Sequence, residues 1–206
     1  MTTVLSAPTE TPSDIMSLEE FLNFDDGTDA RYELEDGRLL FMPSESDLNQ
    51  RIASFLFAYF IQLGIPFYRL RIGIEIAMMG SRATVRLPDL TVLSEELAQA
   101  MQGASRSLVT LEMPPPQFVV EVVSPGRENE DRDYRYKRSQ YQARGIDEYW
   151  IIDPMQQQVT VFTLSTGLYE EAIFKGDSAI ASPLLSQFNQ PSALTAEKIF
   201  QVGVNE

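Results

Sequence analysis

The chain has 206 residues, 44% of them hydrophobic, and carries a formal net charge of −14 at pH 7. A chain of this length and composition can form one domain with a full hydrophobic core. It contains no run of about 18 consecutive apolar residues, so the sequence predicts no membrane-spanning helix. The strong negative charge argues against a protein that coats nucleic acid by bulk electrostatic attraction.

Histidine and cysteine are both absent from the chain. Their absence excludes disulfide bonds, Ser-His-Asp and Cys-His nucleophilic systems, and the ordinary zinc site. Enzyme chemistry would therefore come from carboxylates, lysine, arginine, tyrosine, hydroxyl groups or a bound hard cation. Oxygen-only ligand sets suit magnesium, manganese or calcium. A chain without cysteine also suits a reducing compartment, so we expect a cytoplasmic protein.

The N-terminal segment differs in composition from the rest of the chain. It is rich in threonine, serine, proline and glutamate. Because it has neither the basic segment nor the apolar core of a secretory signal, we expect residues 1–14 to be a disordered lead-in. Residues 15–206 are expected to form a single domain.

Two short elements are predicted next. Ser17 is a suitable N-cap for a short helix whose first turn is acidic. The Asp36-Gly37 pair predicts a β-hairpin between residues 32–34 and 39–41.

The middle of the chain alternates between helical and strand-like patterns. Apolar residues at helical spacing predict an amphipathic helix over about 46–63. Alternation of apolar and other residues predicts one half-buried strand over 70–77, and a further short strand follows Pro88. The apolar run 118–123 is typical of a central buried strand.

The last third continues the same order of helices and strands. A helix is predicted over about 131–144, with Gly145 as its C-cap. A second buried strand over 149–152, an antiparallel pair at the sheet edge and a final helix capped at Thr195 follow. We therefore predict an α/β fold with a central mixed sheet and helices on both faces.

Basic residues are unevenly distributed along this acidic chain. They could guide a phosphate backbone to the protein, or they could form a solvated, salt-bridged helix face. Ten of the sixteen fall in two stretches: Arg69, Arg71, Arg82 and Arg86, and then Arg127, Arg132, Arg135, Lys137, Arg138 and Arg144.

Glu121 is the anomalous residue of the predicted central strand. Its neighbours are apolar, and an ionised carboxylate in a dry interior costs several kcal/mol unless a cation or hydrogen bonds offset that cost. Strand alternation groups it with Val119 and Val123 on one face. The alternative is a glutamate at the end of a strand, paired with an arginine.

Asp89 is a second candidate acid. A Pro-Asp pair at the start of a strand is common in turns, which is the simpler interpretation. If its strand lies beside that of Glu121, however, the two carboxylates would repel each other and a cation between them would stabilise both.

Lys137 is a candidate partner for these acids. On a helix, Tyr134, Lys137 and Tyr141 lie along one stripe, so tyrosines packed on the sheet would direct the lysine inward. An inward lysine needs a carboxylate or a reacting group beside it. The alternative is a lysine that extends past the tyrosines to the surface.

Four segments together resemble a large bacterial family of restriction endonuclease-like proteins and domains of unknown function. This family is grouped with the PD-(D/E)XK nuclease fold, and the similarity extends over residues 18–174. The segments that carry it are residues 32–37, 88–90, 120–125 and 145–154.

The resemblance implies roles for individual residues. Asp89 matches the aspartate of the motif, and Glu121 matches its second acid; with the backbone carbonyl of Val122 they would bind Mg²⁺ or Mn²⁺. Glu33 resembles the extra N-terminal acid of some members. The usual E-x-K lysine is absent, because valine stands two residues after Glu121, and Lys137 is the matching residue on the next helix.

The resemblance thus implies a metal-dependent endonuclease that hydrolyses phosphodiester bonds in nucleic acid, with DNA as the expected substrate. Such folds often form homodimers in which each protomer cuts one strand. Two alternatives stay open. One is a nuclease fold that is catalytically weak or inactive and serves as a binding or regulatory module. The other is a metal-dependent hydrolase with a different substrate.

Overall fold

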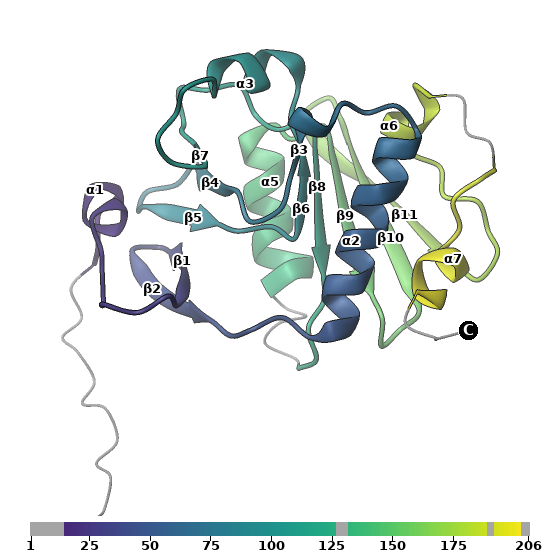
Figure 1. Ribbon diagram of the computed structural model, residues 1–206, viewed down its shortest axis with the longest axis horizontal. Helices are drawn as coiled ribbons and strands as arrows, with labels where there is room; N and C mark the ends of the chain where they lie inside the picture. Colours follow the sequence, from purple (N-terminus) through teal and green to yellow (C-terminus); the bar gives the residue numbers. More distant parts are fainter. Residues whose placement is uncertain (1–14, 127–131, 189–191, 203–206) are drawn as a thin grey trace, which may run out of the picture.

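The computed structural model describes residues 15–126, 132–188 and 192–202 and contains two mixed β-sheets with helices packed on them (Figure 1). In the larger sheet β8 and β9 are parallel and the other neighbours antiparallel. Its six strands follow the order β11 (Leu168–Lys175), β10 (Gln158–Ser165), β9 (Glu148–Asp153), β8 (Phe118–Val122), β6 (Leu90–Val92) and β3 (Leu70–Arg71).

A second, five-stranded sheet was not predicted from the sequence. It contains the predicted hairpin, whose turn places Asp36 and Gly37 at φ angles of 48° and 78°, as a tight hairpin turn requires. Its strands follow the order β2 (Arg38–Met42), β1 (Arg31–Glu35), β5 (Thr84–Arg86), β4 (Glu75–Met78) and β7 (Leu108–Val109).

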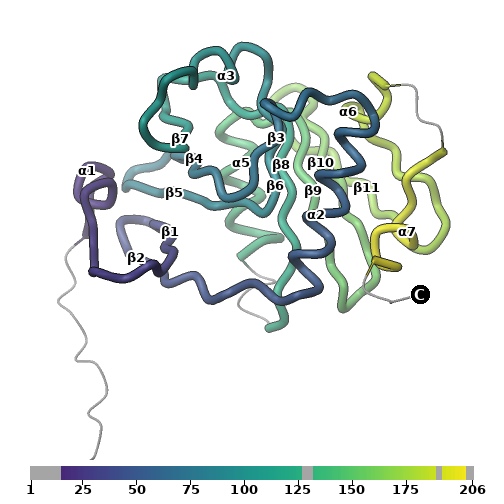
Figure 2. Tube along the Cα trace, in the orientation of Figure 1, coloured from purple at the N-terminus to yellow at the C-terminus, as the bar shows by residue number. Residues whose placement is uncertain are grey.

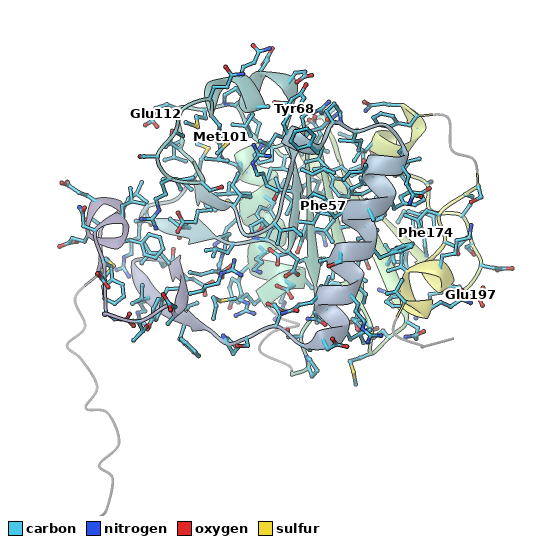
Figure 3. The ribbon with its side chains drawn as sticks, in the orientation of Figure 1. Phe57, Tyr68, Met101, Glu112, Phe174 and Glu197 are labelled. Carbon is cyan, nitrogen blue, oxygen red and sulfur yellow. The ribbon has the colours of Figure 1, made fainter. Side chains whose placement is uncertain are left out.

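Helices cover both faces of the six-stranded sheet, as predicted. On one face α2 (Asp47–Gln62), α6 (Pro183–Ser186) and α7 (Ala196–Gln201) share a core with alternate β8 residues, including Val120 and Val122. On the other face α3 (Glu95–Ala100) and α5 (Arg138–Arg144) share a core with Val119 and Val123. Phe57 and Phe174 pack at the rim of the first core (Figure 3).

The first and last elements of the described chain lie at opposite ends of the molecule. In Figure 2, α1 (Leu18–Leu22) and the β1–β2 hairpin lie at one end, and α6 and α7 lie at the other. The predicted cap at Ser17 is present, with its side chain accepting a hydrogen bond from the Glu20 N–H. The predicted lead-in of residues 1–14 falls outside the described residues.

The prediction of one strand over 70–77 is wrong. The segment follows η1 (Phe67–Arg69) as β3, bends at Gly73, where φ is 70°, and continues as β4 in the other sheet. Ile72 is consequently 56% exposed, although the alternation placed it on the buried face. Such a bend needs the left-handed backbone conformation that glycine adopts readily, and alternation alone does not detect it.

The helix predicted over 131–144 starts differently from an ordinary α-helix. Residues Arg132–Lys137 form a π-helical turn, labelled η2, which continues directly into α5. π-Helical turns are rare and occur frequently at functional sites. Residue 131, the predicted start, lies outside the described part. None of the described helices combines the length and apolar character needed to cross a bilayer.

Gly145 ends α5 in the left-handed conformation, with φ at 80°. A Cβ there would lie 4.0 Å from Pro115 Cγ, an ordinary contact. We therefore expect Gly145→Ala to destabilise the protein through backbone conformation alone, by about 1 kcal/mol, which lowers the melting temperature by roughly 2 to 4 °C. Gly145→Asn should lose less stability than Gly145→Ala, since asparagine tolerates this backbone conformation better than alanine does. Equal losses in the two variants would contradict the explanation.

Candidate functional site

The antiparallel pair β6–β8 brings two candidate acids together. Leu90 lies opposite Val120, and extending this register by one residue places Asp89 opposite Glu121 on the same face of the sheet. Asp89 Oδ2 accepts a hydrogen bond from the Val122 N–H at 2.6 Å, which ties the Asp89 side chain to the strand that carries Glu121.

Glu121 is buried, and both of its oxygens have partners. The Tyr141 hydroxyl donates to Oε1 at 2.6 Å, and Lys137 Nζ lies 2.7 Å from Oε2. Burial raises the pKa of Glu121 to about 8, even though the charge of Lys137 opposes this shift. The strand residue that looked anomalous in the sequence therefore has a lysine and a tyrosine as its partners, and both come from the segment after β8.

Lys137 lies at the centre of a buried cluster of charged side chains. Its side chain is 2% exposed, and Nζ lies 3.2 Å from Asp133 Oδ1 and 3.7 Å from Glu33 Oε1. Burial acts to lower the pKa of Lys137, but attraction to Asp133, Glu121 and Glu33 outweighs it and raises the pKa above its ordinary value. The ammonium group is therefore charged at neutral pH. The alternative of a surface lysine is wrong.

Glu33 enters the cluster from β1. Its Oε2 pairs with Arg86 Nη1 at 2.8 Å, and its Oε1 accepts from the Leu87 N–H at 3.0 Å. Burial acts to raise the pKa of Glu33, but Lys137 and Arg86 overcome this and lower it to about 2. Glu33 is therefore ionised and held by two basic side chains. We call Glu33, Arg86, Glu121, Asp133 and Lys137 the Lys137 cluster.

The backbone carbonyl of Val122 lies beside Asn49 of α2. Asn49 Nδ2 donates to this carbonyl at 3.3 Å and also lies within hydrogen-bonding distance of Ser124 Oγ and Glu45 Oε2. A carbonyl oxygen has two lone pairs, so the one bond leaves Val122 able to accept a second partner.

The structure thus brings together Glu33, Asp89, Glu121 and Lys137, the four side chains that the sequence analysis proposed for one site. The sequence analysis missed Asp133 and Arg86 as members of the cluster. Asp133 had a usable signal, because it precedes Lys137 by four residues and such pairs meet on a helix. Arg86 had none, since its pairing with Glu33 joins strands that are distant in the sequence.

The basic residues of the two stretches do not form one exposed surface that could guide a phosphate backbone to the protein. Arg86, Lys137 and Arg144 are buried, and Arg144 donates to the carbonyls of Thr110 and Met113. For these three residues the interpretation as a guide for a phosphate backbone is wrong, because internal carboxylates and carbonyls already bind them. Arg127 lies outside the described residues.

The donor chemistry around Lys137 fits a hard divalent cation. Asp89 Oδ1 has no hydrogen-bond partner among the described residues. Carboxylates here outnumber basic side chains by five to three: Glu33, Glu35, Asp89, Glu121 and Asp133 against Arg86, Lys137 and Arg132, whose Nε lies 4.0 Å from Asp133 Oδ1.

In the described ranges, no group of three or more Asp, Glu, His or Cys side chains is placed to hold one metal ion. Mg²⁺ commonly uses one or two carboxylates and completes its shell with waters and substrate phosphates.

The family comparison gives the class of this protein as nuclease-like. Residues 18–197 match the model of the Uma2 family, described as "Putative restriction endonuclease". The match covers most of the chain, so the protein belongs to this family.

A solved structure supports the same fold. It is described as "a putative nuclease belonging to DUF820" from Anabaena variabilis ATCC 29413, and it aligns with a TM-score of 0.67 at 18% sequence identity. The alignment covers 91% of this chain and 98% of that chain. No curated protein matches the sequence.

The Glu33–Arg86 pair provides a pH-dependent test of the cluster. Because the pKa of Glu33 is lowered to about 2 from an ordinary 4.5, its ionic contribution is fully present above pH 4.5 and is lost as the pH falls towards 2. We expect Glu33→Gln to lower the free energy of unfolding by about 3 to 5 kcal/mol at pH 7, since it leaves buried charges unpaired, and by less at pH 3.

Urea unfolding of the parent and the variant at both pH values measures this difference. Glu170→Gln on the exposed strand β11 is the matched control and should change stability little at either pH. If Glu33→Gln lowered the free energy of unfolding equally at pH 3 and pH 7, the assigned ionisation of Glu33 would be contradicted.

Proposed function

We propose that this protein is a metal-dependent nuclease that hydrolyses phosphodiester bonds in nucleic acid, with DNA as the substrate. The observation that carries the proposal is a buried ammonium group, Lys137, 2.7 Å from Glu121, on the sheet face that also carries Asp89. An acid pair with a neighbouring lysine is the set of groups that metal-assisted hydrolysis of a phosphodiester needs.

Asp89, Glu121 and the Val122 carbonyl would hold Mg²⁺ or Mn²⁺. When bound, such an ion lowers the pKa of a coordinated water and offsets negative charge on the phosphate. The raised pKa values of Asp89 and Glu121, about 7 and about 8, arise chiefly from burial. Binding of the cation would release protons from them and would therefore tighten as the pH rises.

Lys137 would position the attacking water and stabilise negative charge on the phosphate. Its ammonium group is a compact donor. Asp133 and Glu33 hold Nζ at 3.2 and 3.7 Å and are positioning residues in this scheme. The Tyr141 hydroxyl, which donates to Glu121 Oε1, fixes the orientation of that carboxylate.

A binding module without turnover is the second candidate function. One observation favours it: both oxygens of Glu121 are already engaged, by Tyr141 and Lys137. A carboxylate accepts up to about four hydrogen bonds, so these partners do not prevent metal binding, and we favour the nuclease.

A homodimer would allow each protomer to cut one strand of a duplex.

Metal linkage tests the ligand assignment. Because the cation would offset repulsion between buried carboxylates, millimolar Mn²⁺ or Mg²⁺ should raise the melting temperature of the parent protein. Glu121→Gln should stay folded and lose most of this rise, whereas Glu170→Gln should keep it. A metal response in Glu121→Gln equal to that of the parent would exclude Glu121 as a ligand.

The role of Lys137 is tested by single-turnover cleavage at saturating substrate. Lys137→Ala removes the ammonium group and should reduce the rate by at least about 100-fold. Lys137→Arg, which keeps the positive charge, should also cut slowly, because a planar guanidinium group cannot replace a compact ammonium. Arg135→Ala, at an exposed position of the same helical segment, should keep the parent rate.

Melting temperatures and the metal response identify variants that have lost the fold rather than the chemistry. A folded Lys137→Arg protein that cuts at the parent rate would contradict the role given to the ammonium group.

A further inference from the structure

A large cavity opens beside the candidate site. Its volume is about 520 Å³, and its walls come from the β1–β2 hairpin, the first half of α2, the bend around Gly73 and the segment before β6. Asp89 lines the cavity, and so do Asn49 and Gln50. We call it the Phe41 cavity, after the aromatic side chain at its wall.

The cavity reaches one of the proposed metal ligands, Asp89. Asp89 belongs to both, because it lines the cavity and its Oδ2 accepts from the Val122 N–H. Asn49, also on the wall, donates to the Val122 carbonyl at 3.3 Å. A molecule in the cavity would therefore lie beside Asp89, one of the groups that bind the cation in the proposed function.

The walls combine exposed apolar surface with amide groups. Phe41 and Ile72 are 61% and 56% exposed, and Phe41 keeps its orientation through an edge-to-face contact with Tyr32, with ring centroids 5.9 Å apart. Gln50 is exposed on the same cavity. A flat ring system with hydrogen-bonding edges suits such walls, because the ring stacks on the aromatic face and the amide pairs with the edge.

The charge of the cavity does not suit a long row of phosphates. Among the described residues that line it, Arg31 is the one basic side chain, beside the acidic Asp29, Glu45 and Asp89. Proteins that bind duplex DNA through its backbone neutralise several phosphates with lysine and arginine. One arginine and one aromatic ring instead match a single nucleotide, with one phosphate and one accessible base.

We propose that the Phe41 cavity binds an unpaired nucleotide of the substrate, with its base against Phe41 and Ile72 and its phosphate near Arg31. This inference rests on the proposed nuclease function and narrows its substrate to nucleic acid with at least one unpaired base. A single strand, an overhang and a base flipped out of a duplex share this chemistry, since each exposes a base face that a regular duplex hides.

Binding is tested with fluorescein-labelled oligonucleotides in the presence of Ca²⁺, a hard cation that takes oxygen ligands, and a denaturing gel confirms that the probes stay intact. The probes are a single strand, its blunt duplex, the duplex with an overhang, and the duplex with one mismatch. We expect the single strand and the overhang to bind at least about tenfold more tightly than the blunt duplex. Tight binding of the mismatched duplex would show that the cavity takes a base flipped out of a duplex.

The variant Phe41→Ala should weaken binding of the single strand by about tenfold, because it removes one stacking surface. Phe67→Ala is the matched control: Phe67 is 73% exposed but does not line this cavity, and its loss should leave the affinity unchanged. Both side chains are exposed, so both variants should fold, and their melting temperatures confirm this.

The outcomes separate this inference from the proposed function. Preference for the blunt duplex, or equal affinities of the Phe41→Ala and Phe67→Ala variants, would overturn the cavity assignment and leave the nuclease proposal standing if cleavage is observed. A single strand bound through Phe41 but not cleaved with Mg²⁺ or Mn²⁺ would support the cavity and contradict the nuclease proposal.

Discussion

A buried ammonium group requires opposite charge around it, and the position of Lys137 imposes this requirement on three separate parts of the chain. β1 supplies Glu33, β8 supplies Glu121, and the π-helical turn supplies Asp133. Each of these acids is itself buried. The cluster therefore links the five-stranded sheet, the six-stranded sheet and the helix between β8 and β9. Glu33 and Lys137 are both buried and charged, so the contacts that join these elements also fix the proposed chemical groups in place.

The two acids on adjacent strands serve different purposes in this arrangement. Glu121 faces the protein interior, with Lys137 and Tyr141 on its two oxygens. Asp89 uses one oxygen to bind the backbone of β8 and lines the Phe41 cavity. A cation held between them would therefore meet fixed protein groups on one side and a bound molecule on the other. This division is consistent with a site in which the protein supplies only some of the metal ligands and the substrate supplies others.

Much of the larger sheet could be predicted because its strands have simple patterns. The continuous apolar run 118–123 predicted β8, and the helical spacing of apolar residues over 46–63 predicted α2, which packs on this sheet. Glu121 and Lys137 were recognisable because each contradicts its local pattern. The bend at Gly73 and the second sheet were not predicted, because both depend on backbone conformation and long-range pairing. For the same reason the partner of Arg86 was not predicted, because Glu33 lies 53 residues away in the sequence.

Metal-dependent cleavage is the central claim, and one assay with purified protein tests it most directly. The parent and Asp89→Asn are incubated with single-stranded and overhang DNA in Mn²⁺, in Mg²⁺ and in chelator, and products are resolved on a denaturing gel. Asp89→Asn keeps the size of the side chain but removes the charge that would hold the cation. Our account predicts cleavage by the parent in either metal, none in chelator, and none by Asp89→Asn. Cleavage that persists in chelator, or at an equal rate in Asp89→Asn, would contradict it.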